Sequence, residues 1–224
     1  MNSEPFVTHP EGGVTPAESF GALLRARGLE PRWSLPEDGS GLPLPEATTV
    51  LALRYGEGVI LAGDRRATAG NLIAHRNVQK VFPGDDFSAV AISRTAGVAA
   101  EMIRLFQTEL EHYEKLEGSR LSLEGKANHL AAMIRRQLPM AFQGLVVIPL
   151  FCGYDEHEGA GRLYSFDVVG GRYEETDYAA PGSGGRDARL YLRTKFGDDL
   201  SEDAALSLAV EALVAAAEED TATS

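Results

Sequence analysis

The order of β-rich and helical segments predicts an α+β fold, in which two antiparallel sheets form a sandwich with helices outside it. Two observations support this prediction. Short β-rich segments occur in two separate blocks along the 224-residue chain, and each block is followed by a pair of helical segments. Segregated blocks of this kind favour layered α+β architectures, whereas regular alternation of strand and helix would indicate a parallel sheet.

The first β-rich block begins at Thr48. Four segments, separated by Gly, Asn or Asp, have the length and composition of strands: "TTVLALRY", "GVILAGDRR", "KVF" and "FSAVAIS". The second block lies between the two helical pairs and contains "GLVVIPLFCGYD", "GRLYSFDVVGG" and "RYEETDYAAPG". Both blocks read as strand meanders joined by tight turns.

Apolar residues at helical spacing predict four helices. The first covers about residues 96 to 116, and the second ends near Pro139. The third runs from Arg186 to Phe196. The fourth carries one apolar face made of Leu206, Val210, Leu213, Val214 and Ala217.

Residues 1–47 differ in composition from the rest of the chain. They hold seven of the 11 prolines, and only residues 18–30 have a helical pattern. Such a segment cannot form a core of its own, so we interpret it as an appendage, either a linker or a removable pro-segment. The following 48–224 region is then the folded domain.

Composition excludes several function classes. The net charge of −12 argues against nucleic acid or an anionic membrane as a partner. A single cysteine, Cys152, excludes an internal disulfide and a Cys-rich zinc site. The longest apolar run, residues 145–151, is far too short to span a bilayer. We therefore expect a cytoplasmic protein without metal or cofactor.

Two motifs resemble ligand sites but have simpler interpretations. "DEHE" (155–158) lies between two predicted strands, where a solvated hairpin loop is the better interpretation. "PGSGGRD" (181–187) could cradle an anion with its backbone amides, yet it lacks the lysine of a P-loop and the full dinucleotide fingerprint. A phosphate site is therefore weakly supported, and the simpler interpretation is a tight strand-to-helix turn. An anion- or nucleotide-binding protein remains a minor alternative.

Three residues at the ends of predicted strands suggest a catalytic site. Thr48 opens the first strand, Asp64 follows sixteen residues later, and Lys80 after another sixteen. Each has an ordinary explanation when taken alone, such as a turn aspartate or an edge-strand lysine.

The combination closely resembles the β subunits of actinobacterial 20S proteasomes. The resemblance rests on "TTVLALRYGEGVILAGDRRATAGNLIAHRNVQKVF", "TAGVAAEMIRLFQTELEHYEKLEG", "LEGKANHLAAMIRR", "FQGLVVIPLFCGYD" and "PGSGG", in this order. It covers nearly everything from Thr48 to Thr223 and implies the N-terminal-nucleophile hydrolase fold, a four-layer αββα sandwich. It further implies that residues 1–47 are a propeptide, removed autocatalytically between Ala47 and Thr48.

The resemblance also implies a threonine endopeptidase. Thr48 would be the nucleophile and its freed α-amine the base, with the remaining catalytic residues being Asp64, Lys80, Ser183, Asp220 and Thr223. Thr223 stands where the family has Ser or Thr.

Further positions match substrate contacts of the family. Thr68 and Ala96 would hold the substrate backbone as an added strand. Ala67, Val78 and Ile92 would form the wall of the specificity pocket, and their apolar character suggests apolar substrate residues. The implied partners are proteasome α subunits and other β subunits in seven-membered rings, polypeptide substrates, and an ATP-driven unfoldase.

The sequence departs from the family pattern at three points, and two of them, Arg94 and the short C-terminus, motivate a rival hypothesis. Arg94 replaces the glycine whose backbone N–H forms the oxyanion hole, and Ala47 replaces the glycine before the nucleophile. The chain also stops at "EEDTATS", where the family continues with further strands, which predicts that the C-terminal strands are missing. The rival is therefore a non-catalytic structural subunit of the ring, with a fragment as another explanation of the short C-terminus.

Overall fold

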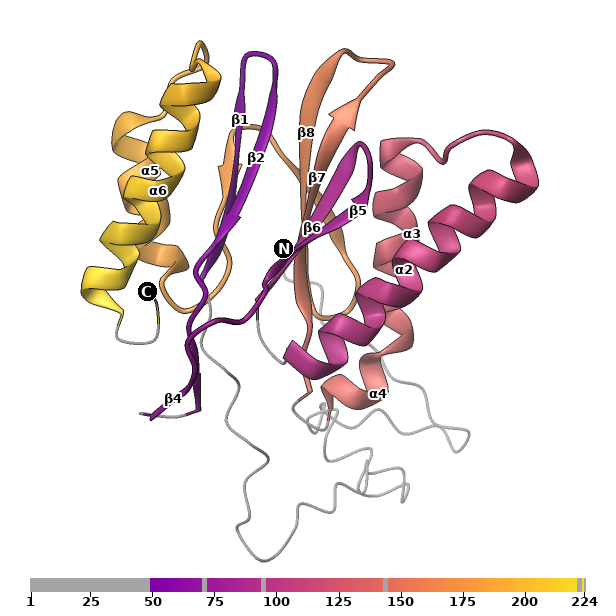
Figure 1. The fold of residues 1–224 in the computed structure, drawn as a ribbon, viewed down its shortest axis with the longest axis horizontal. Coiled ribbons are helices and arrows are strands. Elements are labelled where there is room, and N and C mark those ends of the chain that lie inside the picture. Colours follow the sequence, from indigo (N-terminus) through magenta and orange to yellow (C-terminus); the bar gives the residue numbers. More distant parts are fainter. Residues whose placement is uncertain (1–48, 70–71, 94–95, 143–144, 221–222, 224) are drawn as a thin grey trace, which may run out of the picture. The chain divides into compact units, whose positions relative to one another are not determined.

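The computed structural model describes residues 49–69, 72–93, 96–142, 145–220 and 223. Two antiparallel sheets pack face to face, and a pair of helices covers the outer side of each (Figure 1). The layers therefore follow the order helix, sheet, sheet, helix. This arrangement confirms the predicted sandwich of two antiparallel sheets with helices outside it.

The larger sheet has five strands in the order β5-β6-β7-β8-β9. Their bounds are β5 (Val81–Asp85), β6 (Ser88–Ser93), β7 (Ile148–Asp155), β8 (Ala160–Phe166) and β9 (Arg172–Glu175). The smaller sheet has the order β10-β1-β2, with β1 (Val50–Tyr55), β2 (Gly58–Gly63) and β10 (Tyr178–Ala179). A separate hairpin joins β3 (Ala67–Ala69) to β4 (Leu72–His75).

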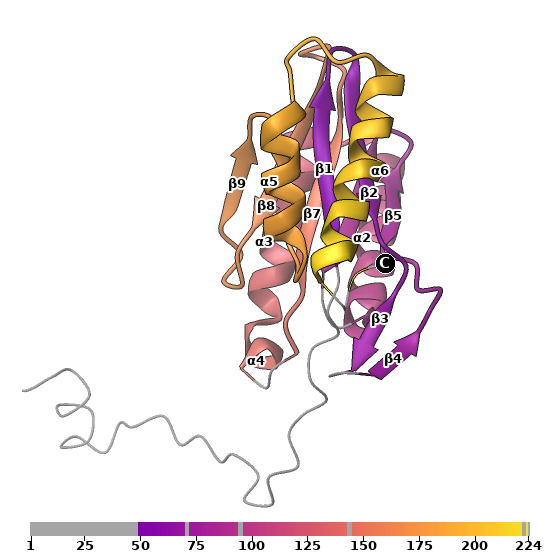
Figure 2. The same cartoon turned by 90° about the vertical axis from the view of Figure 1, so that its left-hand side faces the viewer.

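The helices lie in two pairs with a short addition. Helices α2 (Ala96–Glu117) and α3 (Leu123–Arg136) cover the larger sheet, and α4 (Leu138–Ala141) follows α3. Helices α5 (Gly185–Lys195) and α6 (Glu202–Glu219) lie side by side over β1 and β2, as Figure 2 shows. The four predicted helices correspond to α2, α3, α5 and α6, with ends shifted by a few residues. None of the helices in the described ranges is long and apolar enough to cross a membrane.

Strand β1 shows why the sheets pack on both faces. Side chains alternate along a strand, so successive residues face opposite layers. Val50 and Ala52 are buried in the cluster between the two sheets, whereas Leu51 and Leu53 are buried in the cluster under α5 and α6. The unbroken apolar run of this segment therefore reflects a central strand that is covered on both sides.

One predicted helix face is wrong. Leu206, Val210 and Val214 on α6 are each more than half exposed, at 53%, 54% and 53%. The face of α6 that packs inward is instead made mainly of alanine, with Ala205, Leu208, Ala209, Ala212 and Ala216 buried. Small side chains let this helix approach α5 and the sheet closely, so Leu206, Val210 and Val214 lie on the other side, while Leu213 still packs partly against the core.

Antiparallel pairing brings several segment ends together at one end of the sandwich. In the smaller sheet, Val50 at the start of β1 pairs with Gly63 at the end of β2. Beyond β10, Gly182 forms an isolated bridge to Thr49, just before β1. In the larger sheet, Val81 at the start of β5 pairs with Ala91 near the end of β6. Residues that flank these strands are distant in sequence but can meet here.

Candidate active site

A buried ion pair lies at this end of the sandwich. Asp64 directly follows β2 and Lys80 directly precedes β5, and Lys80 Nζ lies 2.7 Å from Asp64 Oδ1. Their side chains are only 4% and 2% exposed. Two charges removed from water in this way are retained only where their geometry and further hydrogen bonds compensate the loss of hydration. The predicted partnership of Asp64 and Lys80 therefore has the required geometry.

Backbone hydrogen bonds hold both members of the pair in place. Lys80 Nζ also donates to the carbonyl oxygen of Arg66, and the Arg66 N–H donates to Asp64 Oδ2 at 3.2 Å. The carbonyl of Lys80 accepts from the N–H of Ile92 at 2.9 Å, which joins it to β6. The ammonium group is thus positioned by the β2–β3 connection, while its backbone belongs to the larger sheet.

Asp64 is also bonded to the backbone of Thr49. The Thr49 N–H donates to Asp64 Oδ1 at 3.0 Å, the same oxygen that binds Lys80. In return, the Asp64 N–H donates to the Thr49 carbonyl at 3.1 Å. One carboxylate oxygen of Asp64 therefore accepts hydrogen bonds from the Lys80 ammonium group and from the Thr49 N–H, whose nitrogen is bonded to residue 48.

The side chain of Thr49 takes part in a second set of bonds. It is completely buried, and its Oγ1 accepts from the N–H of Gly184 at 3.0 Å. The same oxygen lies 2.6 Å from Oγ1 of Thr223, whose hydroxyl donates to Asp220 Oδ2 at 2.8 Å. The start of β1, the β10–α5 turn and the segment after α6 are joined through this one hydroxyl.

Gly184 is required at its position by packing. A Cβ added there would lie 2.7 Å from Thr49 Oγ1 and 2.9 Å from Thr223 Oγ1, closer than real Cβ atoms come. The absence of a side chain lets the backbone N–H of Gly184 approach the buried hydroxyl. The glycine-rich stretch is therefore a tight strand-to-helix turn, as one interpretation predicted, and its amide at Gly184 is bonded within the chain.

The other predicted site residues are placed as follows. Ala47, Thr48 and Arg94 lie outside the described residues. Thr68 and Ala67 belong to β3, with a bulge between them, and Ala96 is the first residue of α2. Ser183 is exposed in the β10–α5 turn, and Val78 is half-buried. Ile92 is buried in the cluster between the larger sheet and helices α2 and α3.

Sequence reasoning missed Thr49 and Gly184 as members of this site. Thr49 follows Thr48 at the start of the first predicted strand and Gly184 belongs to "PGSGG", but the sequence-based prediction gives neither residue a role. The adjacent threonines were only a weak signal, because threonine is also common at the start of ordinary strands. The partners of the second hydroxyl lie far away in the sequence, so spacing alone could not identify them.

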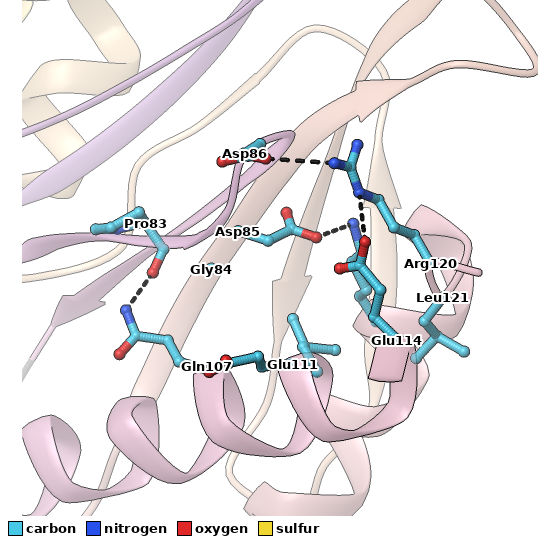
Figure 3. A pocket seen from close by; sticks show the side chains of 11 residues that line it. Pro83, Gly84, Asp85, Asp86, Gln107, Glu111, Glu114, Arg120 and Leu121 are labelled. Carbon is cyan, nitrogen blue, oxygen red and sulfur yellow. Dashed lines mark hydrogen bonds and ion pairs between the residues drawn. The ribbon is translucent and has the colours of Figure 1, made fainter. Parts of the chain in front are cut away.

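A pocket of about 370 Å³ lies away from this site, between the β5–β6 turn and helix α2 (Figure 3). It contains a second ion pair, in which Nζ of the buried Lys126 of α3 lies 2.5 Å from Oδ2 of the partly buried Asp85 at the end of β5. At its rim, Arg120 is paired with Asp86 and Glu114, both at 3.3 Å. Every carboxylate named here is paired with a cation, so this pocket has the character of a structural junction.

The second ligand-like motif is a hairpin turn, as predicted. "DEHE" begins at the last residue of β7, and Asp155 accepts hydrogen bonds from the N–H groups of His157 and Glu158. Its other carboxylate oxygen accepts from Arg162 at 2.9 Å. Within the described ranges, no group of three or more His, Cys, Asp or Glu is placed to hold a metal ion.

Comparison with known proteins assigns the family. A family model described as "Proteasome subunit" matches residues 45–224. A relative from Acidimicrobium ferrooxidans, named proteasome subunit beta, is 59% identical over 187 residues, which is 83% of this chain and 68% of the relative. Relatives of the same name from Streptomyces griseus and Acidothermus cellulolyticus are 55% and 52% identical, covering 85% and 94% of this chain and 68% and 74% of their own lengths.

These matches agree with the layered fold, and the residues matched by the family model include the buried Asp64–Lys80 pair and the Thr49–Thr223 contact. The chain therefore belongs to the proteasome subunit family and, within it, to the 20S β subunits of actinobacterial type.

Proposed function

We propose that this chain is a threonine endopeptidase, in which Thr48 becomes the nucleophile once residues 1–47 have been removed. One observation carries the proposal. Asp64 Oδ1 binds both the Lys80 ammonium group and the backbone nitrogen of Thr49, to which Thr48 is directly bonded. The only buried lysine–aspartate pair at this end of the described chain is therefore anchored to the neighbour of the proposed nucleophile.

The proposed chemistry uses the hydroxyl and the free α-amine of Thr48. A threonine hydroxyl is a weak nucleophile and needs a base within hydrogen-bond reach. A free α-amine has a pKa of roughly 7.7–8.0, close to the operating pH. The positive charge of Lys80, held in place by Asp64, disfavours protonation of a nearby amine and so keeps it available as a base.

Each proton has a defined destination in this mechanism. The Thr48 hydroxyl proton passes to the α-amine as Oγ1 bonds to the substrate carbonyl carbon. The amine then returns the proton to the departing peptide nitrogen, leaving an ester on Thr48. Water attacks the ester while the amine accepts its proton. The amine then gives this proton to Thr48 Oγ1 as the ester C–O bond breaks, so the acid is released and Thr48 regains its starting form.

The remaining predicted residues have supporting roles in the proposal. Ser183, Asp220 and Thr223 would support the amine, and the backbone N–H of Arg94 would stabilise the oxyanion. Thr68 and Ala96 would align the substrate as an added strand, a mode that uses main-chain hydrogen bonds. Ala67, Val78 and Ile92 would shape an apolar specificity pocket.

The proposal includes a closed assembly. We propose that the chain forms seven-membered β rings stacked with rings of α subunits in the cytoplasm, where an ATP-driven unfoldase delivers polypeptides. Confinement in such a chamber explains why the nucleophile would stay blocked until assembly, since a free threonine peptidase of broad specificity would cleave other proteins. Family membership and the names of the relatives support the assembly with other proteasome subunits.

Arg94 favours a second candidate, a structural β subunit without catalysis. Its long side chain replaces a hydrogen atom next to the proposed oxyanion donor. Hydrolysis of a fluorogenic peptide by the assembled particle separates the two candidates. Activity that disappears in Thr48→Ala supports the peptidase, whereas equal rates in both particles would establish the structural subunit.

A further inference from the structure

We infer that Thr49 is a positioning residue of the peptidase. It joins the Asp64–Lys80 pair, which its backbone contacts, to the Asp220–Thr223 pair, which its hydroxyl contacts. The inference rests on the proposed function, because it assigns Thr49 the task of orienting Thr48. It adds a residue that neither the family match nor the names of the relatives assign.

The direction of the hydrogen bonds around Thr49 can be derived from the acceptors. A carboxylate only accepts hydrogen bonds, so the Thr223 hydroxyl must donate its one hydrogen to Asp220 Oδ2, at 2.8 Å. The proton in the 2.6 Å contact between the two threonines must therefore come from Thr49. The N–H of Gly184 donates to the Thr49 oxygen at 3.0 Å. The result is a one-way chain from Gly184 through Thr49 and Thr223 to Asp220.

The backbone of Thr49 is held just as fully as its side chain. Its N–H and carbonyl are both bonded to Asp64, at 3.0 Å and 3.1 Å. Its hydroxyl is bonded to Gly184 and Thr223, and the residue has no exposed surface. All four hydrogen-bonding functions of one buried residue therefore have partners, and these partners come from separate parts of the chain.

The hydrogen bonds of the Thr49 hydroxyl affect the position of Thr48. Thr48 is covalently bonded to the Thr49 nitrogen, so any rotation of Thr49 moves the nucleophile and its amine together. A displacement of about 1 Å at a reacting group can reduce a rate on the order of 100-fold. The side-chain bonds to Gly184 and Thr223 fix the rotation of Thr49 that the backbone bonds to Asp64 leave free.

Packing around Gly184 supports the same conclusion independently. The space that a Cβ would occupy there is filled by the two hydroxyl oxygens of Thr49 and Thr223 and by the Ala216 methyl group at 3.0 Å. A turn that needed only a tight bend would not require this contact, because the φ of Gly184 is −82° and suits any residue. The glycine serves the close approach to the Thr49 hydroxyl.

The test uses the full-length chain co-expressed with its cognate α subunit. Thr49→Val removes the hydroxyl and keeps the shape, while Thr49→Ser keeps the hydroxyl and removes the methyl group. Thr108→Val is the matched control. Thr108 lies on the exposed side of α2, and within the described chain its hydroxyl bonds only to the Arg104 carbonyl of the same helix. Intact mass gives the fraction of chains that begin at Thr48, and each kcat is divided by this fraction.

We expect Thr49→Val to lower kcat about 10- to 100-fold with KM unchanged, because substrate contacts stay while the nucleophile is misplaced. Thr49→Ser should retain kcat within roughly threefold of wild type, as should Thr108→Val. If the valine variant does not assemble, Thr49→Ala provides the same comparison with a smaller side chain.

A double-mutant cycle sharpens the test. Thr223→Val breaks the same chain of hydrogen bonds at its next member. The double variant with Thr49→Val should therefore lose little more kcat than either single variant. Wild-type kcat in Thr49→Val, equal loss in Thr49→Ser, or fully multiplicative losses in the double variant would each overturn the inference. An inactive, unprocessed wild type would instead overturn the proposed function, so the two failures are distinguishable.

Discussion

Two ion pairs, each between a buried lysine and an aspartate, lie at opposite ends of strand β5. Lys80, just before β5, binds Asp64, and Asp85, the last residue of β5, binds Lys126 of α3. Both lysine side chains are almost completely buried, at 4% and 5% exposed. Burial and pairing alone therefore do not distinguish a catalytic pair from a structural one.

The other partners of each aspartate show the difference. Asp85 binds its own turn, accepting from the Ser88 hydroxyl at 2.6 Å and the Phe87 N–H at 3.2 Å. Its pair joins a hairpin to a helix. Asp64 instead binds the backbone nitrogen of Thr49, next to the proposed nucleophile. A buried ion pair becomes a candidate for catalysis when one of its atoms is bonded to a reacting group or its neighbour.

The largest expected effect comes from Asp64→Asn. Loss of the carboxylate charge removes the counter-ion of Lys80, and a single neutral amide oxygen must then serve both the Lys80 ammonium group and the Thr49 N–H, so we expect kcat to fall on the order of 10³-fold or more. Asp85→Asn is the matched control and should leave kcat per processed chain unchanged. Peptide hydrolysis by purified particles measures both. Equal losses of kcat in the two variants would remove the distinction between the pairs.

The second effect is on stability. Lys126→Met leaves Asp85 without its cation, and breaking a buried pair in this way costs about 3–5 kcal/mol in the free energy of unfolding. The partial exposure of Asp85, whose side chain is 21% exposed, places the expected loss at the lower end. Thermal melting of the assembled particle should fall by several degrees, while kcat stays at the wild-type value. An unchanged melting temperature would show that the pair contributes nothing.

A smaller loss is expected from Gly184→Ala. The new methyl group would overlap the hydroxyls of Thr49 and Thr223, and overpacking of this kind costs about 1–3 kcal/mol. Gly197→Ala is the matched control, because a Cβ at Gly197 meets no atom within 4 Å. We expect lower kcat and a lower melting temperature only in the first variant. A fully active Gly184→Ala particle would contradict the required close approach.

The smallest effect is a pH dependence of stability at the structural pair. Burial raises the pKa of Asp85, but hydrogen bonds from Lys126 and Ser88 outweigh it and hold this pKa below its usual value. Because the folded pKa is lowered, the stabilisation is fully present above the unfolded value of about 3.9 and is lost as the pH falls through the folded pKa. Acid unfolding curves should differ less between wild type and Asp85→Asn at the lowest pH than at pH 6. A constant difference would contradict this assignment.

Much of the fold could be predicted because local patterns dominate it. The strand-rich blocks and the paired helices follow from apolar periodicity and turn residues, and α2 begins at Ala96, as predicted. The inward face of α6 could not be predicted in this way. Both sides of that helix carry apolar residues, and only the tertiary contact with α5 and the sheet selects the alanine side.

The candidate site likewise has residues that could be predicted from the sequence and residues that could not. Asp64 and Lys80 could be identified through the resemblance to proteasome β subunits, because their spacing from Thr48 agrees with that family without a gap. The Thr49–Thr223 contact could not, because it joins residues 174 positions apart and depends on side-chain rotation. Gly184 could be identified as part of a turn motif. The reason for a glycine there could not, because it is the close packing of the Thr49 and Thr223 hydroxyls.

The most direct test of the central claim is the intact mass of this chain after co-expression with its cognate α subunit. We predict that wild type loses residues 1–47 and begins at Thr48, whereas Thr48→Ala keeps its full mass in the same assembled particle. A full-length wild-type chain in a properly assembled particle would contradict the claim, and the structural-subunit hypothesis would then take its place.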